Sequence, residues 1–264
     1  MDSLRISCDA AKAIIDPQGG RLSSLEIAGN EVLVTDGDKP TKWGSFPMIP
    51  WCGRLAGGVL HFAGHQYQFP LTNEFHANHG LAHLQRWDVE AHTETMVKLS
   101  TRLVSPWVFG GVVRQRFEFD ANMLSVEVQV EAEHYSMPMM VGWHPWFRRR
   151  LAIGDEAELR IKPGRQYEVD TYAIPTGELV AVGPQPWDDC FIDLAERPVI
   201  SWPGAFDLTI DSSFDHWMVY TAPEHALCVE PMSGPPNQVN SLPSIIEPGQ
   251  RFAGWMNLTW SADL

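Results

Sequence analysis

The chain has 264 residues and a formal charge of −14 at pH 7, with 44% hydrophobic and 20% charged residues. This composition is typical of a globular chain that can bury a large core. The negative charge argues against nucleic acid or an anionic membrane surface as a partner, and it disfavours a phosphorylated substrate without excluding one. No apolar stretch approaches the roughly 20 residues that span a bilayer.

The first residues and the cysteines indicate the compartment. Residues 1–5 lack the basic start and apolar run of a secretion signal, so a cytoplasmic location is expected. Two disulfides are arithmetically possible, but free thiols in a reducing cytoplasm fit the missing signal better. Each cysteine is therefore expected to be a small buried apolar residue, at Cys8, Cys52, Cys190 and Cys228.

Hydrophobic and polar residues alternate in several short segments. Residues 28–31 predict a hairpin turn between the apolar residues at 25, 27, 32 and 34. In the clearest strand, 123–133, Leu124, Val126, Val128 and Val130 face one way and polar residues face the other. Further strands are predicted at 97–103, 112–119, 205–211, 215–221 and 252–260.

The spacing of these strands indicates the fold class. The 21 glycines and 20 prolines are spread along the chain rather than gathered in a linker. No segment with a helical period is longer than about two turns. Many short alternating strands separated by turns predict an all-β fold, either a β-sandwich or a barrel. Because no repeat or domain boundary is apparent, we expect one domain over 1–264.

The first segment with chemical potential is 46–58, an irregular loop with two prolines and three glycines. It presents a single cation, Arg54. A guanidinium can donate two parallel hydrogen bonds to vicinal hydroxyls or to a carboxylate. Taken alone, an arginine in a turn is more commonly exposed and without such a role.

The next segment, 73–83, is rich in histidine. His76, His79 and His83 have spacings that could chelate a metal on a helix. The stretch has no helical apolar stripe, Gly80 interrupts it, and no supporting carboxylate can be assigned, so no metal site is predicted. We expect instead that His79 hydrogen-bonds a ligand and that Gly80 lets this ligand approach closely.

The segment 141–148 places His144 among Trp143, Trp146 and Phe147, with Pro145 directly after the histidine. Proline favours an extended backbone at His144. Flat aromatic faces beside a group that moves protons near neutral pH suit a site for sugars. The alternative is a core histidine at a strand end.

Two acidic segments follow. Asp188 follows Trp187 in the segment 185–191. One possibility is that it lies in an exposed turn. The other is that it accepts hydrogen bonds from substrate hydroxyls while Trp187 packs against a sugar.

Glu230 ends an apolar run before the proline-rich loop 231–236. Partial desolvation there would raise its proton affinity and suit it to general-base catalysis, whereas a glutamate exposed at a strand end would have no such role.

Taken in chain order, these segments resemble the aldose 1-epimerase (galactose mutarotase-like) family over most of the chain. Each motif is weak alone, but their order over the whole length is specific. The resemblance implies a large antiparallel β-sandwich with the site on one concave face. Its motifs are the opening strand at 20–25, Gly53-Arg54, Asn78-His79-Gly80, the segment 144–147, Asp188 to Phe191, Glu230-Pro231 and the closing turn at 247–250.

The resemblance also implies an isomerase that interconverts the α and β anomers of a free aldose without metal or cofactor. Glu230 would be the base that takes the proton of the anomeric hydroxyl, and His144 the acid that protonates the ring oxygen. Arg54, His79 and Asp188 would hold the hydroxyls and the ring oxygen. The reaction then starts from a protonated His144 and an ionised Glu230, which predicts a bell-shaped pH–rate profile.

Departures from the family pattern leave two alternatives. Gly53 replaces the usual asparagine, so one hydrogen bond to the substrate is lost. One alternative is a carbohydrate-binding protein without turnover, although the presence of both Glu230 and His144 favours an enzyme. The other is a hexose-6-phosphate mutarotase that uses 148–150, three consecutive arginines. His83 stands where such phosphosugar enzymes tend to carry an arginine. Neither the aldose nor the oligomeric state is indicated.

Overall fold

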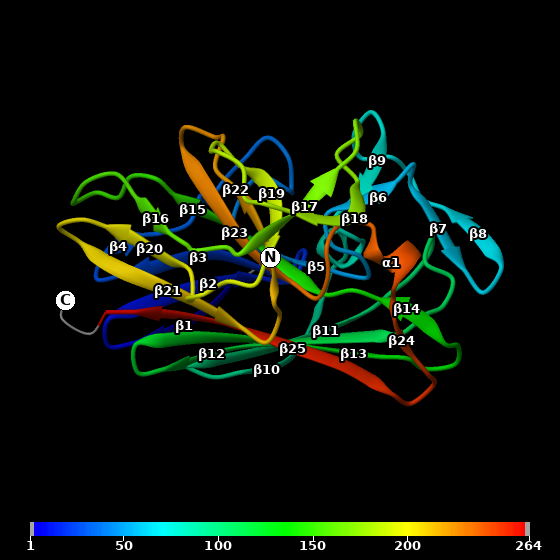
Figure 1. The fold of residues 1–264 in the computed structure, drawn as a ribbon. Coiled ribbons are helices and arrows are strands. Elements are labelled where there is room, and N and C mark those ends of the chain that lie inside the picture. Colours follow the sequence, from blue (N-terminus) through cyan, green and yellow to red (C-terminus); the bar gives the residue numbers. More distant parts are fainter. Residues whose placement is uncertain (1–2, 262–264) are drawn as a thin grey trace.

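The computed structural model describes residues 3–261, and most of its strands lie in two large antiparallel sheets (Figure 1). The first sheet has eleven strands, in the spatial order β1 (Leu4–Cys8), β2 (Ala11–Asp16), β3 (Arg21–Ile27), β5 (Ser45–Met48), β15 (Gly142–Arg148), β23 (Ala226–Met232), β22 (His216–Tyr220), β19 (Asp188–Ile192), β17 (Arg165–Val169) and β18 (Pro175–Val180), with β4 (Asn30–Glu31) beside β3. The second has eight, in the order β10 (Asp88–His92), β11 (Met96–Arg102), β12 (Val112–Asp120), β13 (Met123–Glu131), β25 (Arg251–Trp260), β21 (Phe206–Ser212), β20 (Val199–Trp202) and β16 (Glu158–Arg160). The predicted all-β sandwich is confirmed.

Smaller elements complete the described residues. Three pairs of short strands join β6 (Arg54–Ala56) to β9 (His76–Asn78), β7 (Val59–Phe62) to β8 (His65–Gln68), and β14 (Met137–Met139) to β24 (Ser244–Ile246). A 3₁₀ turn, η1, covers Ala82–Leu84, and the helix α1 covers Gln238–Ser241. Between residues 3 and 261, no helix has the length and apolar character needed to cross a membrane.

The six strands predicted from alternation are all present, as β11, β12, β13, β21, β22 and β25. The hairpin near the start is also present, because β3 and β4 pair across a turn at Ala28 and Gly29. Both turn residues have positive φ, 47° and 77°. A two-residue turn of this kind matches the right-handed twist of paired strands.

The core lies between the two sheets. Leu124, Val126, Val128 and Val130 of β13 are all buried, as their alternation predicts. Gln115 of β12 also points inward, where its amide nitrogen donates to the Gly20 carbonyl at 2.6 Å and its oxygen accepts from the Trp143 indole at 3.0 Å. These bonds satisfy a buried amide and tie the second sheet to the first, which carries the site.

Candidate active site

All five predicted site residues line one pocket of about 240 Å³. This volume is below the roughly 300–1,000 Å³ of pockets for drug-sized ligands, so the pocket suits a small polar molecule. His144, Glu230 and Asp188 lie on β15, β23 and β19 of the first sheet, Arg54 begins β6, and His79 directly follows β9.

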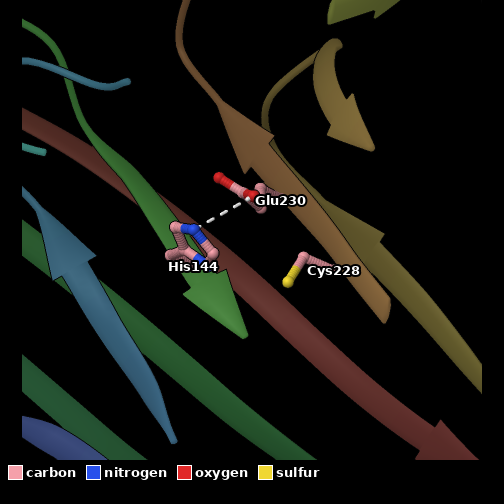
Figure 2. A group of neighbouring side chains, drawn as sticks. All are labelled: His144, Cys228 and Glu230. Atoms are coloured by element: carbon pink, nitrogen blue, oxygen red, sulfur yellow. Dashed lines mark ion pairs between the residues drawn. The ribbon is translucent and has the colours of Figure 1, made fainter. Parts of the chain in front are cut away.

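The central feature of the pocket is the contact between His144 and Glu230. The two residues lie on adjacent antiparallel strands, β15 and β23, whose register pairs Gly142 with Met232 and Trp146 with Cys228. Both side chains therefore leave the sheet on the same face. Nε2 of His144 lies 3.3 Å from Oε1 of Glu230, and the side chains are 6% and 3% exposed. Figure 2 shows the two groups facing each other.

Burial sets the protonation of this pair. Desolvation raises the pKa of Glu230 well above its usual range, with nearby Asp188 adding to the rise and Arg54 opposing it. Desolvation also lowers the pKa of His144, helped by His83. In the free protein the pair therefore favours a neutral imidazole and a protonated carboxyl. The state from which the reaction is predicted to start, with a charged His144 and an ionised Glu230, holds the same number of protons, so a shift of one proton connects the two states.

Aromatic rings hold the imidazole of His144 in place. Its ring stacks on that of Phe46, with centroids 4.9 Å apart and planes 25° apart, and on that of Trp146, with centroids 5.3 Å apart and planes 9° apart. The rings of His79 and His144 meet edge to face, with their centroids 5.0 Å apart and their planes 78° apart. Trp146 also lines the pocket, whereas Trp143 points into the core toward Gln115. Of the two tryptophans beside His144, only Trp146 can face a ligand.

Arg54 and Asp188 form an ion pair at the side of the pocket. Nη2 of Arg54 lies 2.7 Å from Oδ2 of Asp188, and the carboxylate remains 49% exposed. Asp188 begins β19 rather than lying in an isolated exposed turn. Because the guanidinium and the carboxylate meet in the pocket, they present donors and an acceptor next to each other for hydroxyl groups.

Gly53, the departure from the family pattern, is explained by its neighbour. Its φ is +56°, and a Cβ atom here would lie 2.8 Å from the ring of Pro236. Both residues line the pocket. The close approach of Pro236 therefore leaves no room for a side chain at position 53.

His79 lines the pocket, but the predicted reason for Gly80 is wrong. A Cβ atom at Gly80 would lie 2.1 Å from the carbonyl oxygen of Ile49, so the glycine makes room for the neighbouring backbone and not for a ligand. Burial lowers the pKa of His79 well below its usual range, with His144 and His83 acting in the same direction. The imidazole of His79 is therefore neutral at physiological pH.

The three histidines of 76–83 do not gather around a common point. Nε2 of His76 lies 2.8 Å from the Tyr172 carbonyl oxygen, and Nδ1 of His83 lies 3.1 Å from the carbonyl oxygen of His79. Within residues 3–261 they form no group with metal-binding geometry. His83 is a buried residue behind the pocket.

Two other sequence hypotheses assigned ligand contacts to residues that do not line this pocket. Trp187 is buried against Phe191 and Val219, and its indole donates to the Gly183 carbonyl at 2.9 Å, so it does not pack against a ligand in the pocket. The guanidiniums of 148–150 are likewise engaged. Arg148 and Arg149 donate to backbone carbonyls, and Arg150 pairs with Glu156 at 2.6 Å. None of the three lines the pocket.

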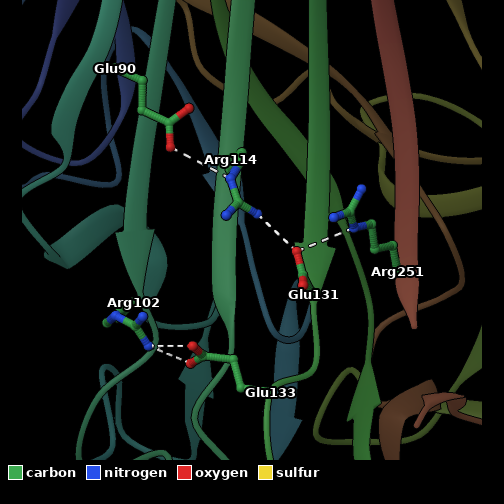
Figure 3. A network of polar contacts seen from close by, with 6 residues as sticks. All are labelled: Glu90, Arg102, Arg114, Glu131, Glu133 and Arg251. Atoms are coloured by element: carbon green, nitrogen blue, oxygen red, sulfur yellow. Dashed lines mark hydrogen bonds and ion pairs between the residues drawn. The ribbon is translucent and has the colours of Figure 1, made fainter. Parts of the chain in front are cut away.

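A second hollow, of about 420 Å³, lies on the eight-stranded sheet and is lined by residues that include Arg114 and Gln129. Its two arginines, Arg114 and Arg116, are paired with carboxylates. Arg114 lies 3.5 Å from Glu90 and 3.0 Å from Glu131, and Arg251 lies 3.2 Å from Glu131. Figure 3 shows this network. This hollow therefore lacks the buried, chemically reactive groups of the first pocket.

Sequence reasoning assigned no role to Arg21, which holds one wall of the pocket. The side chain is buried, donates to the carbonyl oxygens of Pro40 and Trp43 at 2.5 Å each, and lies over the Trp43 ring. Burial lowers its pKa to about 10, so it stays charged at neutral pH. The segment that it holds carries Thr41 and Lys42 into the pocket.

Several lining residues were also given no role in advance. Asn78 stood inside the recognised Asn-His-Gly motif, and this position beside His79 was the available signal. Nothing in the local pattern pointed to the others. These residues are Thr41, Lys42, Asn78, Met218, Tyr220 and Pro236.

Comparison with known proteins shows the fold and the family of the chain. The chain is 28% identical to the uncharacterized protein YihR of Escherichia coli (strain K12) over 225 residues, which is 74% of this chain and 71% of YihR. Its fold matches a GalM/aldose epimerase homologue from C. elegans (TM-score 0.84, 19% identity, 98% of both chains). It also matches a galactose mutarotase-like protein from Clostridium acetobutylicum (TM-score 0.84, 16% identity, 97% of this chain and 94% of that one). The model of the aldose 1-epimerase family matches residues 2–259, and the chain belongs to this family.

Proposed function

We propose that the protein is a cofactor-independent aldose 1-epimerase that interconverts the α and β anomers of a free aldose by opening and closing the sugar ring. One observation carries the proposal: a buried imidazole and a buried carboxyl lie 3.3 Å apart in a pocket of the size of a small polar molecule. The reaction needs one group that donates a proton and one that accepts a proton, held at the same hemiacetal.

The proposed reaction moves two protons and breaks one bond. Glu230, as carboxylate, takes the proton of the anomeric hydroxyl while His144, as imidazolium, gives its Nε2 proton to the ring oxygen. The bond between the anomeric carbon and the ring oxygen breaks, which leaves an aldehyde and a hydroxyl. Rotation about the adjacent carbon–carbon bond exposes the other face of the aldehyde. Reversal of both transfers closes the other anomer and restores the pair.

The reactive state requires a shift of one proton from Glu230 to His144 before ring opening. Bound sugar replaces the direct contact between the two side chains, and Arg54 favours the carboxylate form of Glu230. The rings of Phe46 and Trp146 stack on the imidazole and attract it when it is charged. The pair ends each cycle with the protons it had at the start, so no cofactor takes part in the proposed steps.

Asp188→Asn tests the proposed role of the ion pair in binding hydroxyls. We expect kcat/KM for the aldose to fall about 10–100-fold, because a hydrogen bond to a charged group contributes about 1.5–3 kcal/mol. The matched control is Asp189→Asn, since Asp189 is the next residue of β19 but does not line the pocket. Polarimetry with both variants measures the effect, and equal losses in the two would contradict the assignment.

Arg21→Met tests whether Arg21 positions the wall of the pocket. The change leaves two carbonyls without their donor, so we expect unfolding free energy to fall by about 2–4 kcal/mol and KM to rise. Arg149→Met is the control, because Arg149 also donates to two backbone carbonyls, of Pro223 and Thr221. It should lose stability with KM unchanged. Urea unfolding and polarimetry separate the two outcomes, and the same KM in both variants would exclude the positioning role.

A panel of fresh α-aldoses, including glucose 6-phosphate, tests the proposed function and its substrate. An enzyme accelerates the approach to the equilibrium rotation, whereas a binding protein leaves that rate unchanged while still binding the sugar. The three arginines of 148–150 do not line the pocket of the His144–Glu230 pair, and they line a separate hollow of about 290 Å³. We therefore expect acceleration with neutral aldoses and no preference for glucose 6-phosphate.

A further inference from the structure

Cys228 lies beside the proposed acid and base but has no part in the proposed reaction. It precedes Glu230 by two residues on β23, so both side chains leave the strand on the same face. One donor atom each from His144, Cys228 and Glu230 lie within 4.8 Å of one another, and all three residues are buried (Figure 2). In the described part of the chain, 3–261, no other three residues of this kind come together in this way.

The donor set and its spacing fit a zinc-like ion. Histidine nitrogen, thiolate and carboxylate are the usual ligands of Zn²⁺, which prefers a tetrahedral arrangement. With zinc–nitrogen and zinc–oxygen bonds of about 2.0–2.1 Å, two such ligands lie about 3.3 Å apart. The observed separation between His144 and Glu230 is 3.3 Å. The sulfur of Cys228 must come within about 3.6 Å of the other two atoms, a shift of about 1 Å that side-chain rotation can supply.

Charge also favours a divalent ion here. Burial raises the pKa of the Cys228 thiol well above its usual range, and the neighbouring Glu230 acts in the same direction. Neither group ionises readily alone in this environment. A divalent cation bound to one thiolate and one carboxylate gives a complex with no net charge, which avoids the cost of isolated buried charges. The Arg54–Asp188 ion pair nearby adds no net charge.

We propose that His144, Cys228 and Glu230 form an inhibitory site for thiophilic divalent cations such as Zn²⁺ and Cd²⁺. The ion replaces the protons of the Glu230 carboxyl and the Cys228 thiol and binds the free Nε2 of His144, so two protons are released for each ion. Water from the pocket, which His144 and Glu230 line, takes the fourth position. The metal then holds both groups that ring opening requires. Metal binding at this site does not depend on the proposed function, whereas inhibition of mutarotation by the metal rests on that function.

Cadmium uptake tests the site without reference to activity, because a cadmium–thiolate bond has an ultraviolet charge-transfer absorption. We expect the wild type to take up one Cd²⁺ with this absorption and to release two protons, read with an indicator in weak buffer. Cys228→Ala should lose the absorption and bind Cd²⁺ at least ten-fold more weakly. His144→Gln, which keeps the thiol, should also bind at least ten-fold more weakly. Cys190→Ala, which removes a buried thiol outside the group, should behave as the wild type.

Zinc inhibition of mutarotation is the second readout. Zn²⁺ should inhibit the wild type, a chelator should restore the rate, and Cys228→Ala should work without metal but need at least ten-fold more Zn²⁺ for inhibition. Thermal unfolding checks that the variants are folded. Absence of stoichiometric Cd²⁺ uptake by the wild type, or an unchanged absorption in Cys228→Ala, would overturn the proposal. If Cd²⁺ uptake depends on Cys228 but the protein accelerates the mutarotation of no aldose, the metal site stands and only the proposed function is rejected.

Discussion

Glu230→Gln is expected to lower the enzyme-dependent rate of mutarotation by about 10²–10⁴-fold, the usual contribution of one general base. The amide keeps the size of the side chain but cannot take a proton from the anomeric hydroxyl. The effect should appear in kcat, because Arg54, His79 and Asp188 remain available to hold the sugar. Polarimetry at saturating aldose, corrected for the rate in buffer, measures it.

The same substitution has a predicted effect on stability that depends on pH. Burial raises the pKa of Glu230 in the folded protein above its usual value of 4.5. The stabilising contribution of this group is therefore fully present below pH 4.5 and is lost as the pH rises toward the raised folded-state pKa. Glutamine has no such dependence, so the variant should gain stability relative to the wild type between pH 4 and pH 8. Urea unfolding across this range checks it, and a constant difference would show that Glu230 does not fold as the neutral acid.

His144→Gln is the second change with a large expected effect, a loss of about 10²–10⁴-fold in rate. Glutamine can hydrogen-bond the ring oxygen but cannot transfer a proton to it as the ring opens. If the two residues act as one unit, the double variant with Glu230→Gln should be scarcely slower than either single variant. Losses that multiply would contradict a coupled pair.

The pH–rate profile of the wild type reports the same pair. In its active form the pair shares one proton. At high pH the pair loses this proton because the carboxyl ionises, and at low pH it takes up a second proton. Because burial lowers the pKa of His144, the midpoint of the acid limb should lie below the usual imidazole pKa of 6.5. Because burial raises the pKa of Glu230, the midpoint of the alkaline limb should lie above the usual carboxyl pKa of 4.5. The bell shape predicted from sequence therefore becomes a broad plateau. A rate that falls on acidification with a midpoint near 6.5 would contradict the buried state of His144.

Local alternation was sufficient to predict six of the longer strands. In β13, every second residue is apolar, and burial of that face against the other sheet decides the register of the strand. The order of short motifs along the chain was sufficient to nominate residues that meet in space. Arg54 and Asp188 are 134 positions apart, yet the sheet brings them to 2.7 Å.

Tertiary partners were outside the reach of sequence reasoning. The guanidiniums of Arg21, Arg148 and Arg149 bind backbone carbonyls of distant segments, and carbonyls have no signature in a side-chain pattern. Gly80 was assigned to a ligand because the backbone of Ile49 beside it was not visible in the sequence. The raised proton affinity of Glu230 was predicted from its place before the proline-rich loop, but the lowered pKa of His144 was missed for a related reason, since desolvation depends on how completely the fold covers a side chain.

The most direct test is the rate at which fresh α-galactose and α-glucose reach their equilibrium rotation with equal amounts of wild type and Glu230→Gln. The proposed mechanism predicts that the wild type accelerates at least one of the two sugars and that the variant stays close to the rate in buffer. A wild type no faster than buffer with any aldose that it binds, or a variant as fast as the wild type, would contradict catalysis by the His144–Glu230 pair.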